Sequence, residues 1–205
     1  NGGVTWQLMG LENTVSIGRI VINPLNPLRV YVAAAGSYFA PNVERGVYRS
    51  DNGGSTWSKI LYLNDSTGAI DISMDPVNPN NLLAAMWQRT RYPNGGQLYG
   101  PWSGVHKSVN GGDTWTVMGP ANGLPNSSTT NVGRIGLSTS ASSPNISYAL
   151  FTNGSTYSGF FKTTNAGLNW TNANPNGTLQ NGFSSFSWYF GNVRVHPTDP
   201  NTVYV

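Results

Sequence analysis

The chain has 205 residues, of which 9% are charged and 12% are aromatic, with 25 Gly, 13 Pro and no Cys. This composition is typical of a turn-rich β protein and excludes a disordered chain, which would be rich in charge and poor in aromatic residues. The net charge of +3 comes with no run of Lys or Arg, so nucleic acid is not an expected partner, and the lack of Cys excludes a disulfide framework and a thiolate metal site.

The first predicted strand covers residues 17–22, where Ile20 and Ile22 alternate with Arg19 and Val21. A turn bounded by two prolines follows at residues 23–27, because proline fixes φ and cannot donate to a β-ladder. Three more strands complete this first unit, over residues 30–35, 46–49 and 56–63.

The same order of strands and turns then recurs, and no segment shows the apolar period of an amphipathic helix. The second unit has strands over residues 70–74, 82–87, 104–107 and 114–118. The third has strands over residues 132–137, 148–151 and 159–162, and a fourth unit begins with residues 191–195 and 203–205.

A glycine-rich box recurs between the last two strands of each unit, with the pattern Ser/Thr, any, Asn, any, Gly, any, Thr/Asn, Trp. Its Trp residues stand at positions 6, 57, 115 and 170, which gives a period of 51, 58 and 55 residues. Repeats of this length, made of short strands and glycine turns, are typical of propeller blades. We therefore predict an all-β fold, a partial β-propeller of four-stranded antiparallel blades with about three full blades and flanking pieces. Residues 1–205 form a single propeller segment, expected to belong to a longer propeller protein.

The box residues have structural roles in this prediction. The Asn oxygen bonds nearby backbone N–H groups, glycine supplies positive φ, and the Trp ring is buried with its N–H on a partner. The box positions are Asn1, Trp6, Ser50, Asn52, Gly54, Thr56, Trp57, Ser108, Asn110, Gly112, Thr114, Trp115, Thr163, Asn165, Gly167 and Trp170.

These boxes resemble the Asp-box, or bacterial neuraminidase (BNR) repeat, of sialidases, xyloglucanase-type hydrolases and sortilin-type receptor propellers. Asn stands in every copy where the family has Asp, and Asn169 replaces Thr in the third copy. Residues 18–24, 44–50, 67–71 and 84–89 also resemble large secreted bacterial propellers described as sortilin-like or as BNR-repeat glycosyl hydrolases. The resemblance implies a secreted or cell-surface propeller, but a shared fold does not imply hydrolysis.

Binding residues are expected on one face of the propeller. This face carries the long connections between strands, which hold functional residues in many folds. The proline turns and the boxes lie on the other face. The aromatic and basic residues of the long connections could hold a sugar ring or a peptide, or could only anchor the loops. The candidates are Arg89, Arg91, Tyr92, Trp102, Trp188 and Tyr189.

A second set of candidates comes from aligning the first strands of the four units by their apolar pairs. This alignment places Arg19, Asp71, Arg134 and Asn192 at equivalent positions, as an arc at the mouth of the central channel. Guanidinium groups bind carboxylates through two parallel hydrogen bonds, so the arc could hold an acidic ligand. The alternative is a structural ring of ion pairs between neighbouring blades.

We therefore expect a recognition module that binds a glycan or a peptide on the long-loop face. The alternatives are a sialidase- or xyloglucanase-like glycoside hydrolase and a scaffold without a small-ligand site. Hydrolysis needs two facing carboxylates, and the best acids, Asp71, Glu44 and Asp65, show no such spacing, so we assign no catalytic residue.

No metal and no cofactor is expected, because neither His lies in a ligand pattern. No stretch approaches the about 18–20 apolar residues of a membrane span. The expected partners are thus a glycan, a protein or peptide, and other domains of the same longer chain.

Overall fold

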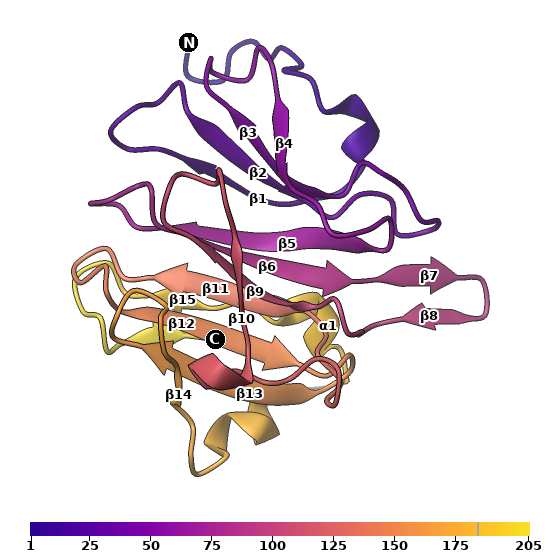
Figure 1. The fold of residues 1–205 in the computed structure, drawn as a ribbon, viewed down its shortest axis with the longest axis vertical. Helices are drawn as coiled ribbons and strands as arrows, with labels where there is room; N and C mark the ends of the chain where they lie inside the picture. Colours follow the sequence, from indigo (N-terminus) through magenta and orange to yellow (C-terminus); the bar gives the residue numbers. More distant parts are fainter. Residues whose placement is uncertain (184) are drawn as a thin grey trace.

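The computed structural model describes residues 1–183 and 185–205 and confirms the all-β prediction. Three four-stranded antiparallel sheets lie one above another, and a fourth sheet begins beside the third (Figure 1). In each of the three sheets the first strand in the sequence is at the inner edge, and the following strands are added outward one after another. This is the architecture of successive blades in a partial propeller.

The strands of each blade are as follows. Blade 1 contains β1 (Ile17–Ile22), β2 (Val30–Ala34), β3 (Gly46–Ser50) and β4 (Ser58–Leu61). Blade 2 contains β5 (Thr67–Met74), β6 (Leu82–Gln88), β9 (Gly104–Ser108) and β10 (Thr116–Met118). Blade 3 contains β11 (Ile135–Thr139), β12 (Ser147–Thr152), β13 (Tyr157–Thr163) and β14 (Thr171–Asn172), and blade 4 has β15 (Arg194–Val195) and β16 (Val203–Tyr204).

The connections hold further short elements. A hairpin of β7 (Thr90–Tyr92) and β8 (Gly95–Gln97) extends the blade 2 loop. Its two turn residues are Pro93 and Asn94, since Tyr92 pairs with Gly95, and nothing in the repeat pattern marks this hairpin. The short helices are η1 (Glu12–Thr14), η2 (Pro120–Asn122), η3 (Thr178–Gly182) and α1 (Ser187–Phe190). None of the helices in the described residues has the length and apolar character needed to cross a bilayer.

Three inner strands begin at residues other than those predicted, and the last of them, β15, starts at Arg194 rather than at residue 191. β5 starts at Thr67, because Asn64 and Thr67 form a bridge and a register shift after Ala69 lets the strand continue. β11 starts at Ile135, because the preceding residues leave the regular ladder: the Gly133 N–H and the Arg134 carbonyl both bond to Thr152.

The hydrophobic core lies between neighbouring blades. Alternate residues of β6 point to opposite faces of its sheet, as the period of a strand requires. Leu82, Ala84 and Met86 pack against blade 1, whereas Ala85 and Trp87 pack against blade 3. Each blade therefore depends on its neighbours to bury its two apolar faces.

One face of blade 1 remains uncovered. Ile20, Ile72, Leu137 and Val193 occupy the same register position in the four inner strands, and the last three are at most 1% exposed. Ile20 is 56% exposed. The face of blade 1 that carries Ile20 thus has the apolar residues of a blade interface, but no blade among the described residues packs against it.

The three complete boxes fold through the same hydrogen bonds. Asn52 Oδ1 accepts from the Thr56 N–H and from the Ser50 hydroxyl, both at 2.9 Å, and Asn52 Nδ2 donates to Thr56 Oγ1 at 2.8 Å. Ser50 Oγ accepts from the Gly54 N–H at 2.8 Å. The second box repeats these four bonds, and the third keeps three, because Asn169 replaces the Thr. Asparagine therefore contributes a donor as well as the predicted acceptor.

The box Trp residues anchor the turns. Trp57 Nε1 donates to the Met9 carbonyl at 2.7 Å, and the Trp115 and Trp170 N–H groups donate to glycine carbonyls of their own boxes. Trp170 is buried, whereas Trp6 of the incomplete first box is 91% exposed.

The third box contains a strained residue. Ala166 has φ 56°, where the other two complete boxes have Gly53 and Gly111 at φ 71°. Because a Cβ is disfavoured in this region, Ala166→Gly is expected to raise the free energy of unfolding by about 0.5–1 kcal/mol, after the entropy that glycine adds to the unfolded chain is subtracted. Urea unfolding at equilibrium would measure it.

The matched control is Gly53→Ala. A Cβ at Gly53 would meet Leu28 Cδ2 at an ordinary 3.5 Å, so its cost comes from φ alone. This variant should lose about the amount that Ala166→Gly gains. Equal stability of both variants and the parent chain would contradict the strain.

Candidate functional site

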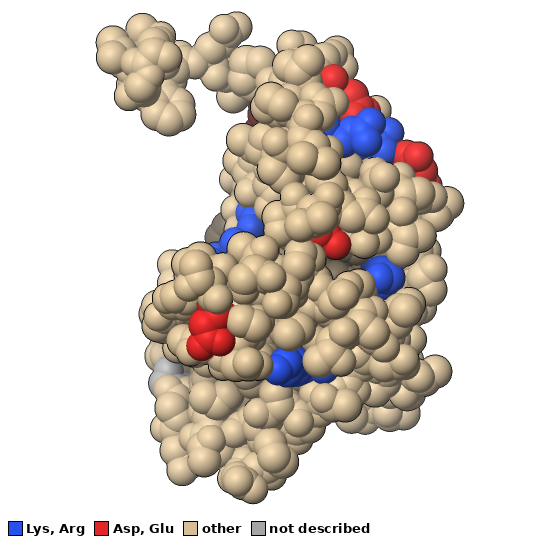
Figure 2. Space-filling view, turned by 90° about the vertical axis from the view of Figure 1, so that its left-hand side faces the viewer, with Lys and Arg blue, Asp and Glu red and all other residues tan. Residues whose placement is uncertain are grey.

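The two ends of the blades differ in character. The turn between the inner strands β5 and β6 lies at the left in Figure 1, whereas the β7–β8 hairpin extends to the right. Figure 2 shows the short-turn side, where blue and red residues adjoin near one edge of a largely uncharged surface. Arg29 and Arg49 both pair with Asp51, at 2.5 and 3.1 Å, and Arg49 also pairs with Asp113 at 2.6 Å. The two guanidinium groups and the two carboxylates of this cluster thus neutralise one another.

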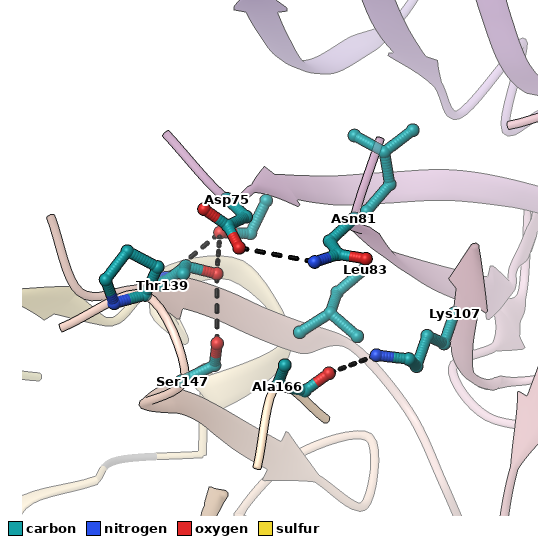
Figure 3. Close-up of a pocket in the computed structure, with 10 residues that line it drawn as sticks. Asp75, Asn81, Leu83, Lys107, Thr139, Ser147 and Ala166 are labelled. Carbon is teal, nitrogen blue, oxygen red and sulfur yellow. Dashed lines mark hydrogen bonds between the residues drawn. The ribbon is translucent and has the colours of Figure 1, made fainter. Parts of the chain in front are cut away.

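A small polar seam joins blades 2 and 3 on the same side (Figure 3). Lys107 Nζ donates to the Ala166 carbonyl, Asn81 donates to Asp75 at 3.3 Å, and Ser147 donates to Thr139 at 3.0 Å. The cavity between them measures about 10 Å³, which is room for one water molecule. The seam therefore belongs to blade packing.

The inner strands β1, β5, β11 and β15 are neighbours along the channel. At their centre, Arg19 Nε lies 2.6 Å from Asp71 Oδ1, and Asp71 also accepts the N–H groups of Leu137 and Ile72 at 2.9 and 2.8 Å. Asp71 is 3% exposed, and burial raises the pKa of its carboxyl, although Arg19 opposes this. The Asp71 carboxylate thus links blades 1, 2 and 3. Its pair with Arg19 is an ion pair between neighbouring blades, which is the structural alternative to ligand binding.

The register corrects the predicted arc at one position. The N–H groups of Asn23, Asp75, Ser140 and His196 close equivalent turns by bonding the carbonyls of Arg29, Asn81, Ile146 and Thr202. Counting back from these turns makes Arg19, Asp71, Gly136 and Asn192 equivalent. Arg134 lies two residues before the equivalent position, Gly136. The alignment by apolar pairs is therefore shifted by two residues in the third unit.

Arg134 nevertheless reaches blade 4. Its Nε donates to the Gly191 carbonyl at 3.3 Å, and its Nη2 donates to Asn192 Oδ1 at 3.4 Å. Burial lowers the pKa of Arg134, which Asp71 and Tyr38 nearby raise in part. The structure therefore brings Arg134 and Asn192 together, although not at equivalent positions.

Arg194 adds a third guanidinium that the sequence alignment missed. Burial, together with the charges of Arg19 and Arg134, lowers its pKa, and Asp71 opposes them. Its signal in the sequence is its place two residues after Asn192 in a strand, which puts both on one side. Among the described residues, neither Arg134 nor Arg194 has a carboxylate within 4.0 Å.

The long loops divide into packed and exposed residues. The Arg89 guanidinium is buried and lies over the rings of Trp188, Trp87 and Tyr38, at 5.0, 5.6 and 5.8 Å. It joins the blade 2 loop to α1, so Arg89 and Trp188 act as loop anchors. The remaining loop candidates are exposed: Arg91, Tyr92, Trp102 and Tyr189.

A second buried arginine supports the same loops. Arg45 is fully buried, and its guanidinium donates to the carbonyls of Ser66 and Arg89 at 2.9 and 2.8 Å and of Ser37 at 2.6 Å. Burial lowers the pKa of Arg45. Nothing in the sequence marks Arg45 as buried.

No metal centre is apparent. The described residues contain no group of three or more His, Asp or Glu side chains that could hold an ion. The predicted acids other than Asp71 are also engaged, since Glu44 accepts from the Tyr48 hydroxyl at 3.2 Å and Asp65 from the Tyr62 hydroxyl.

The fold is similar to that of solved glycoside hydrolase propellers. The chain is 23% identical to a GH74 enzyme of Niastella koreensis, with a TM-score of 0.67. The match covers 99% of this chain and 30% of the Niastella enzyme. The chain is 24% identical to an ancestral GH74 enzyme, with a TM-score of 0.59, over 83% of this chain and 20% of that enzyme. It is 13% identical to the GH74 xyloglucanase of Xanthomonas campestris, with a TM-score of 0.65, over 92% of this chain and 26% of that enzyme. The chain thus spans less than a third of the length of each.

These likenesses show the propeller fold. No protein family model and no curated protein matches the chain.

Proposed function

We propose that this propeller segment recognises a glycan that carries a carboxylate, at a channel site formed by Arg134, Asn192, Arg194 and Tyr189. The observation that carries the proposal is the excess of guanidinium over carboxylate along the inner strands and at Arg134, which directly precedes β11. Asp71 is committed to Arg19 and to two backbone N–H groups, which leaves Arg134 and Arg194 without an acidic partner among the described residues.

The chemistry of these groups favours an acidic sugar. A guanidinium presents two parallel donors to a carboxylate, and a partly buried one gains more from the pair than an exposed one. Tyr189 is 59% exposed, acts electrostatically on Arg134 and offers a ring for the apolar face of a sugar. The similar solved propellers, which include a xyloglucanase, support a glycan over a peptide.

Recognition has more support than hydrolysis. A glycosidase needs two carboxyl groups about 5–10 Å apart across the scissile bond. Asp71 is the single acidic residue of the inner strands β1, β5, β11 and β15, and its oxygens already accept from Arg19 and from two backbone N–H groups. The channel site therefore has the groups to bind a glycan and lacks a free acid to cleave one.

Calorimetric titration with tetragalacturonate tests the proposal. Arg134→Gln should raise the dissociation constant by about tenfold or more, because the variant loses a charge-assisted pair. Added salt should weaken binding to the parent chain.

The matched control is Arg91→Gln, which removes an exposed guanidinium that lies over Phe39 on another loop. This variant should bind tetragalacturonate like the parent. Binding that survives Arg134→Gln unchanged, or no binding by the parent, would overturn the channel site.

A further inference from the structure

A second cavity lies away from the channel, at the outer edge of blade 2. It measures about 380 Å³, within the range of small-ligand sites. The outer strands β9 and β10 form its floor, and two loops form its walls, residues 101–104 and 119–128. The Ser127 hydroxyl donates to the Pro101 carbonyl at 2.8 Å, which ties the two loops together.

The cavity has an aromatic wall and uncharged surroundings. Trp102 lines it and is 52% exposed, a large apolar ring open to solvent. Three prolines and Val117 continue the apolar surface. No Lys, Arg, Asp or Glu is among its lining residues, so the cavity offers nothing to attract an ionic ligand.

One polar group in the cavity wall lacks a well-formed hydrogen bond. His106 is 8% exposed, and its Nδ1 is buried without a hydrogen bond of acceptable geometry among the described residues. Buried polar atoms in folded proteins nearly always have a partner, and leaving one unpaired costs about 1–3 kcal/mol. Burial lowers the pKa of His106 to about 4, against the weaker opposite effect of the Gly104 carbonyl, so the ring is neutral at physiological pH.

Other polar groups surround the same space. The buried Ser103 hydroxyl accepts from the Gln88 N–H at 3.0 Å, which leaves its own proton free to be donated. Asn126 and Ser128 stand at the rim of the cavity and are exposed. The cavity thus combines one open ring face with several neutral hydrogen-bonding groups.

We propose that this cavity binds a neutral sugar, with Trp102 stacked on the ring of the sugar and His106 bonded to one of its hydroxyl groups. A pyranose has an apolar face and a rim of hydroxyls, which match the indole and the neutral donors and acceptors. A peptide would also bring backbone groups along its length, for which the cavity offers few partners. The inference does not depend on the channel site, since no residue is shared.

The test is a titration observed through the indole N–H resonances of the ¹⁵N-labelled chain, with cellotetraose, mannotetraose and chitotetraose as probes. At least one probe should shift the Trp102 resonance, which Trp102→Phe identifies by its disappearance. Trp102→Ala should raise the dissociation constant of that probe about tenfold or more, because stacking is lost. His106→Phe should raise it about tenfold, because the ring is kept and the hydrogen bond is not.

Two controls make the outcome decisive. Phe39→Ala removes another exposed ring, 71% accessible on the blade 1 loop, and should leave the affinity unchanged, as should Arg134→Gln. Circular dichroism would show that each variant is folded. Binding should also be constant from pH 5.5 to 8, since His106 stays neutral there.

The proposal is overturned if none of the three sugars shifts the Trp102 resonance, or if Trp102→Ala binds them like the parent. A proline-rich decapeptide that shifts Trp102 where the sugars do not would also overturn it. Loss of tetragalacturonate binding in Arg134→Gln together with intact Trp102 binding would separate the two sites.

Discussion

Arg45→Met is expected to lower the free energy of unfolding by about 1–3 kcal/mol. Methionine can fill much of the space but cannot donate. The carbonyls of Ser37, Ser66 and Arg89 would then be buried without the guanidinium donors that they have now. The Ser66 carbonyl keeps the Arg89 N–H, at 3.0 Å, and the Ser37 carbonyl keeps the Asn42 amide, at 2.9 Å. Among the described residues the Arg89 carbonyl is therefore the acceptor left unpaired, at a cost of about 1–3 kcal/mol. Guanidinium chloride unfolding of both chains gives the difference.

Arg91→Met serves as the control for Arg45→Met. Arg91 is also an arginine of the long-loop face, but it is exposed and only lies over Phe39, at 5.9 Å. Its substitution should change the free energy of unfolding by no more than about 0.5 kcal/mol. If the two variants were equally stable, the carbonyls around Arg45 would have to be satisfied in another way.

Arg19→Met is expected to cost about 3 kcal/mol near pH 7.5 and much less near pH 4. Arg19 is the partner that lowers the pKa of the buried Asp71, and without it burial raises that pKa further. A buried acid with a raised folded pKa binds its proton more tightly when folded. Stability is therefore retained below the unfolded pKa of Asp and lost as pH rises through the folded pKa. Unfolding free energies at both pH values measure the effect.

The double variant Arg19→Met with Asp71→Asn isolates the cause. It removes the titrating group, so the pH dependence specific to Arg19→Met should disappear. A pH dependence that persists in the double variant would assign it to another residue.

The sequence predicted the blades well because their signals are local and repeated. The box pattern and the proline turns mark each blade independently, and three of the boxes form nearly the same hydrogen bonds. The ends of β5 and β11 differ from the prediction because they depend on bonds to residues of other segments, such as Thr152. The β7–β8 hairpin departs from the repeat and so has no counterpart in the other blades to reveal it.

The site was harder to predict than the fold. The alignment by apolar pairs placed Arg19, Asp71 and Asn192 correctly, but the glycine at position 136 gave no side chain to align, and Arg134 took its place. Arg89 reads as an exposed loop charge, and only its three surrounding rings show that it is an anchor. The His106 cavity lies between two loops, residues 101–104 and 119–128, that come together through the pairing of β9 with β10, and no local sequence pattern indicates it.

The β7–β8 hairpin has a consequence for how such propellers diversify. Its strands satisfy their ladder bonds with each other, and the Arg91 N–H bond to the Tyr38 carbonyl ties it to blade 1. Lengthening or exchanging its tip would leave the ladder of every blade intact. Descendants of this chain could therefore acquire new specificities by variation in one short hairpin, while the boxes preserve the architecture that carries it.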